Sequence, residues 1–287
     1  SKMKLKTIII LAVIVLMLYG CGYIGNKLPQ MTPQEERWNI TDMITELTAE
    51  SNQTISITKT GNISAPKISA LQPKDGRFEN IMEVDCNNGL CKTKNCIVDY
   101  KIAPEMQSFA KKVAAMCEIE FPKIKERIRN PDVKMPPKFV FNKTLEKGYA
   151  GIETGDKIYL NAEYFAKNPT DLGAIVHEMV HSAQNYYGDY PMWACEGIAD
   201  YTRSWLGYNE WGTPRCSSYF PNYTSGYDCA AALFQYIERE YDQSIVTTID
   251  EAMRHERYTD SLFEYPTGKT LEELWLECRE KDCKYAE

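Results

Sequence analysis

The chain has 287 residues, of which 44% are hydrophobic and 25% are charged, as is ordinary for a folded globular protein. This length accommodates one large domain or one domain with an appendage. The formal net charge is −7, and no basic stripe interrupts the acidic balance. Composition and charge therefore exclude nucleic acid as an expected partner.

Residues 1–22 have the organisation of an export signal. Three lysines within the first six residues precede an apolar run over 8–19, which is shorter than the roughly 20 apolar residues of a membrane-spanning helix. The run ends in Leu-Tyr-Gly-Cys at 18–21, which is close to a bacterial lipobox in which Cys21 is lipidated. Cleavage after Gly22 is the alternative. We therefore predict a secreted or extracytoplasmic protein that contacts a membrane only through a lipid on Cys21 or an uncleaved signal.

Residues 23–98 are predicted to form a spacer or a small accessory unit. Apolar residues at helical spacing within 33–50 predict an amphipathic helix, and 54–62 predicts a hairpin. The stretch 65–76 is rich in proline, lysine and serine. None of these patterns indicates a function.

The chain contains ten cysteines, which in an exported protein are expected to pair as disulfides rather than to bind a metal. Without Cys21 an odd number remains, so one cysteine is expected to stay a thiol. We predict Cys195, because it lies on a segment expected to be a buried helix, where a thiol behaves as a small apolar group. The other eight are predicted to form four bridges: Cys216–Cys229, Cys278–Cys283, and two among Cys86, Cys91, Cys96 and Cys117.

The remainder of the chain, 99–287, mixes helical and extended patterns. A helix is predicted over 104–129, a strand begins with Phe-Val-Phe at 139–141, and the glycine-containing stretch 148–155 predicts a turn region. Alternating apolar residues over 157–161 predict another strand. Both helices and strands are therefore expected in this part of the chain.

A mostly buried helix is predicted over 172–184. Asn-Pro-Thr-Asp at 168–171 predicts its start, with Asn168 as the N-cap and proline at the first helical position. Six apolar residues of this segment indicate the burial: Leu172, Ile175, Val176, Met179, Val180 and Ala183.

This helix carries the pattern H-E-x-x-H at 177–181. Residues four apart project from the same helix face, so His177 and His181 can bind one ion, with Glu178 turned toward the same open side. A chance match with ordinary surface or core histidines is the alternative. The chain has only three histidines, and an imidazole without a partner is costly in an apolar helix. The pattern therefore favours a zinc site.

A catalytic zinc ion normally has three protein ligands and a fourth position for water, so a further ligand is expected downstream. Glu196 follows His181 by fifteen positions in a segment that also predicts a helix. Asp200, one turn later on the same face, is suited to accept the second ring N–H of a ligand histidine, and its use as the ligand is the rival assignment. H-E-x-x-H followed by E-x-x-x-D resembles the gluzincin peptidases, including the aminopeptidase branch with W-x-x-E-G. This resemblance favours Glu196.

A closer resemblance rests on four motifs: His-Glu-Met-Val-His at 177–181, Glu-Gly-Ile-Ala-Asp-Tyr at 196–201, Gly-Tyr-Asp at 226–228 and Gly-Lys-Thr-Leu-Glu-Glu-Leu-Trp at 268–275. Together they resemble the plant basic secretory proteins and their microbial relatives, a family regarded as zinc metallopeptidases. The resemblance runs from about Asp99 to the C-terminus. It implies an α+β zincin-like domain over 99–287, with a small sheet, an active-site helix and a mostly helical C-terminal part.

The resemblance also implies roles for two further elements. In zinc peptidases of this kind the strand before the active-site helix, here 157–161, is an exposed edge that binds extended substrate backbone. An ordinary internal strand is the alternative. Tyr227, in the family-like Gly-Tyr-Asp, is a candidate donor of a hydrogen bond to the developing oxyanion.

The expected activity is that of a metallopeptidase with one Zn²⁺ per chain, held by His177, His181 and Glu196, with Asp200 supporting a ligand. Zinc lowers the pKa of a bound water to about 7, and Glu178 is the expected general base. The expected partner is a protein or peptide substrate, and the chain is expected to be a monomer. Two alternatives stay open: a non-catalytic surface binding or structural protein on a zincin scaffold, and a zinc hydrolase of a non-peptide amide.

Overall fold

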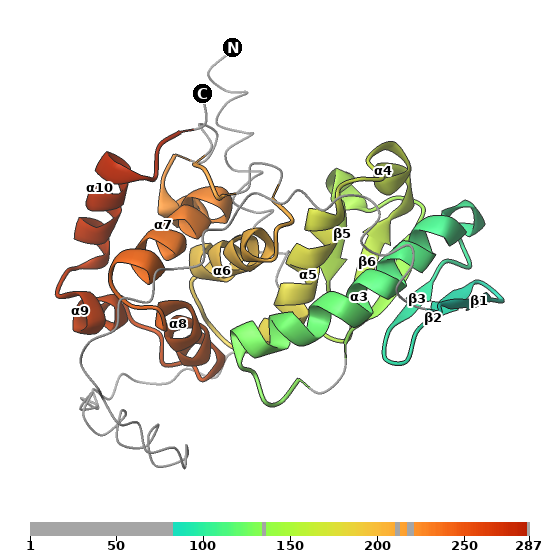
Figure 1. The fold of residues 1–287 in the computed structure, drawn as a ribbon, viewed down its shortest axis with the longest axis horizontal. Coiled ribbons are helices and arrows are strands. Elements are labelled where there is room, and N and C mark those ends of the chain that lie inside the picture. Colours follow the sequence, from blue (N-terminus) through green and yellow to red (C-terminus); the bar gives the residue numbers. More distant parts are fainter. Residues whose placement is uncertain (1–82, 134–135, 210–212, 217–220, 286–287) are drawn as a thin grey trace, which may run out of the picture. The chain divides into compact units, whose positions relative to one another are not determined.

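The computed structural model describes residues 83–133, 136–209, 213–216 and 221–285 (Figure 1). The predicted export signal with Cys21, and the helix and hairpin predicted within 33–62, lie outside the described residues. Within them the chain forms eight α-helices and one six-stranded sheet, so the predicted α+β class is confirmed. Among the same residues, no helix is both long enough and apolar enough to cross a membrane.

The sheet has the strand order β1-β2-β3-β4-β6-β5. Its strands are β1 (Asp85–Asn87), β2 (Leu90–Lys92), β3 (Ile97–Asp99), β4 (Lys138–Asn142), β5 (Gly151–Glu153) and β6 (Lys157–Asn161). β3, β4 and β6 run parallel, and the other neighbours are antiparallel. Alternation along the strands turns Phe139 and Phe141 of β4 into the core. β1 and β2 fall within the predicted spacer 23–98, and through β3 they belong to the same sheet as β4.

One edge of the sheet is β5, which corrects one of the two interpretations of 157–161. β6 lies between β4 and β5 and is an internal strand. β5 occupies only Gly151–Glu153 of the stretch 148–155 that is predicted as a turn region. Turns lie on both sides of it, at Glu146–Gly148 and around Gly155, and Gly148 and Gly155 have φ values of +76° and +74°. The alternation of side chains along a strand indicates which residues point to each face of the sheet, but not which strands lie beside it. The pattern of 157–161 therefore fits an edge strand and an internal strand equally well.

The long helix α3 (Gln107–Ile128) follows a short 3₁₀ turn at Pro104–Met106 and ends at Arg129, which adopts the left-handed conformation with a φ of 55°. The predicted helix over 104–129 therefore holds apart from its first turn. Small and aliphatic residues, among them Ala110, Val113 and Ala114, form its buried face. α3 packs against the helix α5 (Leu172–Gln184) and against β2 and β3, as Figure 1 shows.

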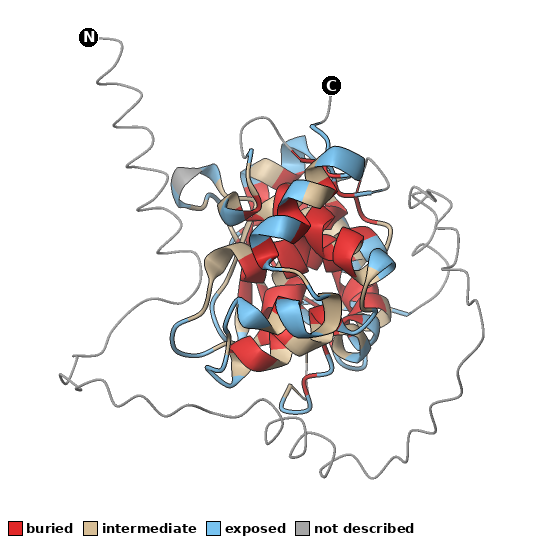
Figure 2. Cartoon of the chain, turned by 90° about the vertical axis from the view of Figure 1, so that its left-hand side faces the viewer, coloured by how far each residue is buried: buried red, intermediate tan, exposed pale blue. Residues whose placement is uncertain are grey.

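The rest of the described chain is helical. Its helices are α4 (Ala162–Lys167), α5 (Leu172–Gln184), α6 (Met192–Trp205), α7 (Tyr227–Glu240), α8 (Ile245–Arg254), α9 (Ser261–Thr267) and α10 (Leu271–Lys281), with 3₁₀ turns at Glu146–Gly148 and Tyr223–Ser225. α5 contacts β5 and β6 on one side and α6 on the other. In Figure 2 the buried residues of these helices face the interior and the exposed residues lie outside.

Among the helices that the structure describes, α6 and α7 form the most extensive pair, and small residues bring them together. A Cβ atom placed on Gly197 would lie 2.5 Å from Ala230 Cβ, so only glycine fits at this crossing. The close approach matters because α6 carries Glu196 and α7 begins with Tyr227.

Four disulfides link the described cysteines: Cys86–Cys91, Cys96–Cys117, Cys216–Cys229 and Cys278–Cys283. These are the four predicted bridges, so the prediction is confirmed and the pairing among the first four is now specified. Cys195 is buried and takes part in no disulfide among the described residues. Its sulfur instead lies 3.6 Å from His181 Nδ1.

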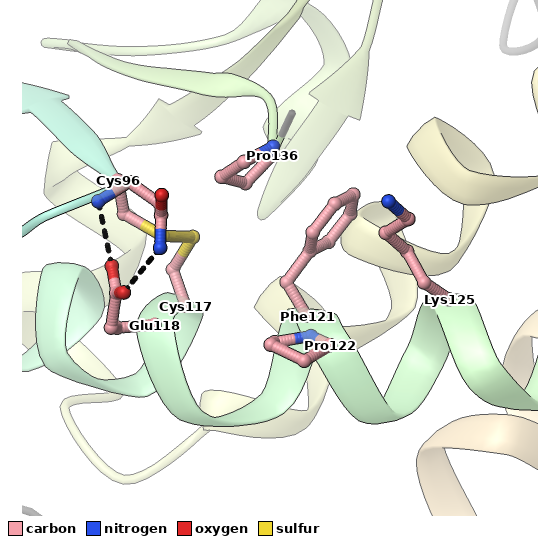
Figure 3. A pocket seen from close by; sticks show the side chains of 8 residues that line it. Cys96, Cys117, Glu118, Phe121, Pro122, Lys125 and Pro136 are labelled. Atoms are coloured by element: carbon pink, nitrogen blue, oxygen red, sulfur yellow. Dashed lines mark hydrogen bonds between the residues drawn. A yellow bond between two sulfur atoms is a disulfide. The ribbon is translucent and has the colours of Figure 1, made fainter. Parts of the chain in front are cut away.

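A pocket of about 280 Å³ opens beside the Cys96–Cys117 disulfide, with Phe121 of α3 in its lining (Figure 3). At one end Glu118 accepts hydrogen bonds from Thr93 Oγ1 at 2.6 Å and from the backbone N–H of Asn95 at 2.9 Å. Glu118 thereby ties the β2–β3 turn to α3. None of the residues that line this pocket belongs to the H-E-x-x-H motif or to the E-G-I-A-D-Y motif.

Candidate metal centre

The start of α5 differs from the prediction. Asp171, and not Asn168, is the N-cap, and its Oδ1 accepts the backbone N–H of Ala174 at 3.2 Å. Its Oδ2 accepts the hydroxyl of Tyr164 at 2.7 Å. Asn168 instead ends α4, where its side chain donates to the Tyr164 carbonyl at 2.9 Å. Asn and Asp both favour helix caps, so the residue type does not decide between them. The sequence pattern does not predict α4, and therefore assigns Asn168 to the start of α5 and not to the end of α4.

Three potential donor atoms converge between α5 and α6. His177 Nε2 lies 2.9 Å from His181 Nε2 and 3.1 Å from Glu196 Oε2, and the latter lies 3.6 Å from His181 Nε2. The three residues are 8%, 9% and 8% exposed, so the site is nearly buried but reachable. Three ligand atoms of a tetrahedral zinc ion are separated by about 3.3 Å when the bonds are about 2.0 to 2.1 Å long. The donor set therefore fits a zinc ion.

Asp200 contacts the opposite edge of the His177 ring. Its Oδ1 lies 2.7 Å from His177 Nδ1 and 3.2 Å from Arg203 Nη2. The structure thus brings Glu196 to the converging Nε2 atoms and Asp200 to the remaining ring nitrogen of His177. In this arrangement Glu196 could contribute to a metal site, while Asp200 could orient the ring of His177.

The electrostatics of the cluster follow from these contacts. Burial alone raises the pKa of Glu196, but His181 and His177 outweigh it and hold the pKa well below its usual range. Burial lowers the pKa of His177, but Asp200 and then Glu196 outweigh it and raise the pKa to about 9. Burial raises the pKa of Asp200, but Arg203 and then His177 lower it overall. Both carboxylates are therefore charged at neutral pH, which suits the binding of a cation.

Glu178 lies against the edge strand β5. A Cβ atom on Gly151 of β5 would lie 2.8 Å from Glu178 Cγ, and the backbone N–H of Glu153, the last residue of β5, acts to lower the pKa of the Glu178 carboxyl group. Burial is the largest influence on the carboxyl group of Glu178 and raises its pKa, although His177 and His181 act in the opposite direction. A carboxylate with a raised pKa takes up a proton more readily, as a general base requires.

Tyr227 borders the same cluster. Its ring is nearly parallel to the His177 ring, at 16° and with 6.2 Å between the centroids. It begins α7 with a φ of 50°, a conformation that is uncommon outside glycine, directly after Gly226 at 78°. A Cβ atom on Gly226 would lie 3.3 Å from Glu196 Cβ. The Gly226-Tyr227 turn therefore packs directly on two residues of the donor set.

Three residues of the centre were not found from the sequence. Gln184 places its Oε1 2.7 Å from His181 Nδ1, and Arg203 pairs with Asp200. Glu153 has a pKa raised to about 7, chiefly by burial, with His181 and Glu178 as its charged neighbours. Gln184 stands three positions after His181, so the two residues share a helix face. This spacing is the sequence signal by which Gln184 could be found. Glu153 and Arg203 reach the centre through tertiary contacts, for which the sequence gives no signal.

A family model matches residues 147–278, and its family is BSP, described as a peptidase of plants and bacteria. This segment of the chain therefore matches a family of peptidases. The family indicated by the sequence motifs is thereby confirmed for residues 147–278, and the match contains His177, Glu178, His181, Glu196 and Tyr227. Neither the comparison with curated proteins nor the comparison with solved structures gives a match.

Proposed function

We propose that this protein is a zinc-dependent peptidase whose centre lies between α5 and α6. The observation that carries the proposal is the convergence of His177 Nε2, His181 Nε2 and Glu196 Oε2, with distances of 2.9 to 3.6 Å between them. Family membership of the segment 147–278 supports a peptidase at a coarser level, without naming the metal.

His177, His181 and Glu196 would hold the zinc ion. When bound, zinc polarises a carbonyl group and lowers the pKa of a water to about 7. Asp200 accepts the Nδ1–H of His177, so Nε2 is the nitrogen of that ring that would bind the ion. Arg203 in turn holds Asp200 in place.

Glu178 is the proposed acid and base of the reaction. Its carboxylate takes the proton of the attacking water and returns that proton to the leaving amine of the cleaved peptide. Gly151 of β5 leaves room for this side chain against the sheet edge, because a Cβ atom there would lie 2.8 Å from Glu178 Cγ. The proposed role of Tyr227 is to donate its hydroxyl proton in a hydrogen bond to the oxyanion that develops on the carbonyl.

The edge strand β5 is the proposed place for the substrate backbone. It pairs with β6 on one side only in the described sheet, and it contacts α5 directly. An extended peptide that adds a strand to this edge passes Gly151 and Glu153 and so reaches Glu178. This explains in physical terms why a peptide, rather than a compact small molecule, is the proposed substrate class.

The test is the variant Glu178→Gln, which keeps the shape of the side chain and removes the base. The parent should cleave unfolded casein or a quenched peptide library, lose activity on chelation and regain it with zinc. The variant should bind zinc like the parent and lose at least about 100-fold in rate. Glu163→Gln, the same change at an exposed residue of α4, is the control and should leave the rate unchanged. A parent that cleaves nothing, or a Glu178→Gln variant as active as the parent, would show the proposal to be wrong.

The four disulfides support an extracytoplasmic location, because disulfides persist in oxidising compartments. We propose that the N-terminal segment exports the chain and that Cys21 carries a lipid if the signal is of the lipoprotein type. Mass spectrometry of the mature N-terminus tests this directly. A mature chain that begins after Gly22 would contradict lipidation and leave export intact.

A further inference from the structure

The side chain of Gln184, the last residue of α5, bridges the two helices of the metal centre. It is 1% exposed. Its Oε1 lies 2.7 Å from His181 Nδ1, and its Nε2 donates to the backbone carbonyl of Cys195 at 3.1 Å. Cys195 directly precedes Glu196 on α6. One buried amide therefore contacts both the ring of one proposed ligand and the backbone next to another.

The Cys195 carbonyl decides which way this amide faces. A carbonyl oxygen only accepts hydrogen bonds, so the NH₂ group of Gln184 must be the end that meets it. The oxygen of the amide then faces His181 Nδ1, and because that oxygen also only accepts, Nδ1 must carry the proton. In the neutral ring the lone pair is then left on Nε2, the atom that lies 2.9 Å from His177 Nε2. The opposite amide orientation would set two acceptors against each other.

The position of the bridge is itself fixed. Asn130, just beyond the end of α3, donates from its side chain to the carbonyls of Ala183 at 2.9 Å and of Gln184 at 3.3 Å. Asn185 ends the helix in the left-handed conformation with a φ of 47°. The backbone of Gln184 is thus held on one side while its side chain holds α6 on the other.

We propose that Gln184 is a positioning residue of the metal centre, which sets the tautomer of His181 and the separation between His181 and Glu196. The inference rests on the metal site of the proposed function. It differs from the arrangement at His177, whose ring is oriented by the carboxylate of Asp200. Each proposed histidine ligand thus has its own partner, a charged one for His177 and a neutral one for His181.

The sulfur of Cys195 is the competing partner for His181, and the geometry ranks it second. Its distance to His181 Nδ1 is 3.6 Å, whereas the amide oxygen of Gln184 lies at 2.7 Å. A short contact to an amide oxygen is a much stronger hydrogen bond than a contact to a thiol. Cys195→Ala is therefore the matched control for substitution of Gln184.

Three variants separate the two tasks of Gln184. Gln184→Met fills the same space and makes neither hydrogen bond. Gln184→Glu keeps an acceptor for His181 Nδ1 and loses the donor for the Cys195 carbonyl. Cys195→Ala removes the sulfur and keeps the amide.

The first measurement is the histidine tautomer by long-range ¹H–¹⁵N correlation spectra of protein stripped of metal, at a pH at which the ring is neutral. We expect the Nδ1–H form of His181 in the parent, in Gln184→Glu and in Cys195→Ala, and a population of the Nε2–H form in Gln184→Met. The Nε2–H form in the parent, or the same tautomer in Gln184→Met as in the parent, would overturn the inference. A side chain that only fills space would leave the tautomer unchanged.

The second measurement is zinc affinity, by competition with a chromophoric chelator. Gln184→Met should bind zinc about 10- to 100-fold more weakly, and Cys195→Ala should bind like the parent. Parent-like affinity in Gln184→Met would also overturn the inference. Neither measurement involves turnover, so an inactive parent enzyme would remove the proposed peptidase activity without touching these results.

Discussion

Gly151 of the edge strand β5 lies so close to Glu178 of α5 that a Cβ atom on Gly151 would come within 2.8 Å of Glu178 Cγ. Gly151 does not have a positive φ, so its backbone accommodates alanine. Its lack of a side chain is therefore required by the neighbouring acid and not by the turn. The missing side chain of Gly151 therefore leaves the space in which the side chain of Glu178, the proposed general base, packs against the sheet edge.

The first prediction follows from that contact. In Gly151→Ala the added methyl group displaces the Glu178 side chain, because the backbone of β5 is held by its pairing with β6. A misplacement of about 1 Å in a catalytic group costs up to about 100-fold, so we expect the peptidase rate to fall by about 10- to 100-fold. Zinc content measured by mass spectrometry should stay at the parent value. An unchanged rate would show that Glu178 does not act from this position.

The second prediction ranks the two acids of α6. Glu196→Ala removes a donor atom of the cluster, whereas Asp200→Ala removes the partner of His177 Nδ1. We expect zinc binding to be weakened by about 10- to 100-fold in Asp200→Ala and by more in Glu196→Ala. Chelator competition at one pH measures both. The reverse order of affinities would make Asp200 the ligand.

The third prediction concerns pH and Glu118. Burial raises the pKa of Glu118, but the hydrogen bonds from Thr93 and Asn95 outweigh it and lower the pKa below its ordinary value of 4.5. A carboxylate with a lowered folded pKa stabilises the fold fully above pH 4.5, and this contribution is lost as the pH falls through the folded pKa. Glu118→Gln should therefore destabilise the protein at neutral pH, by about 1 kcal/mol because the group is only partly buried.

The measurement for Glu118 is denaturant unfolding of parent and variant over a range of pH. The difference in the free energy of unfolding should be constant above pH 4.5 and should shrink below it. A difference that does not depend on pH would mean that the charge of Glu118 contributes nothing to the β2–β3 turn.

The fourth prediction tests the crossing of α6 and α7. Gly197→Ala forces the added methyl group against Ala230, so we expect a loss of about 1 to 3 kcal/mol in the free energy of unfolding from overpacking. Ala230→Gly makes room on the opposite helix and alone costs about 1 kcal/mol in helix propensity. The double variant should be more stable than the sum of the single changes predicts. If the losses in the free energy of unfolding were simply additive, the contact between Gly197 and Ala230 would not be what limits the approach of α6 and α7.

The fifth prediction concerns the cysteines of the described chain. Mass spectrometry without reduction should find the four disulfides and a thiol at Cys195, which reacts with an alkylating reagent only after unfolding because it is buried. Rapid labelling of Cys195 in the native protein would contradict its place in the interior. Its presence in a disulfide would contradict the pairing itself.

The sequence alone determined the features that depend on local spacing and on parity. Helical periodicity placed His177 and His181 on one face, with Glu178 turned toward the same open side. The odd number of remaining cysteines left one thiol over, and the expected burial of its helix selected Cys195. The family motifs indicated Glu196 and a peptidase, which the match over 147–278 supports. The inference from helical spacing succeeds because an α-helix has one regular geometry, so the spacing of two residues along the chain already fixes whether they share a face.

Tertiary structure alone decided which atom meets which. Glu196 and Asp200 lie one turn apart on the same helix, and only the packing of α6 on α5 sets one at His177 Nε2 and the other at Nδ1. The same holds for β5 as the sheet edge and for the bridge of Gln184 to Cys195. Each depends on neighbours supplied by another element, and the side-chain periodicity of one segment carries no information about which segment will lie beside it.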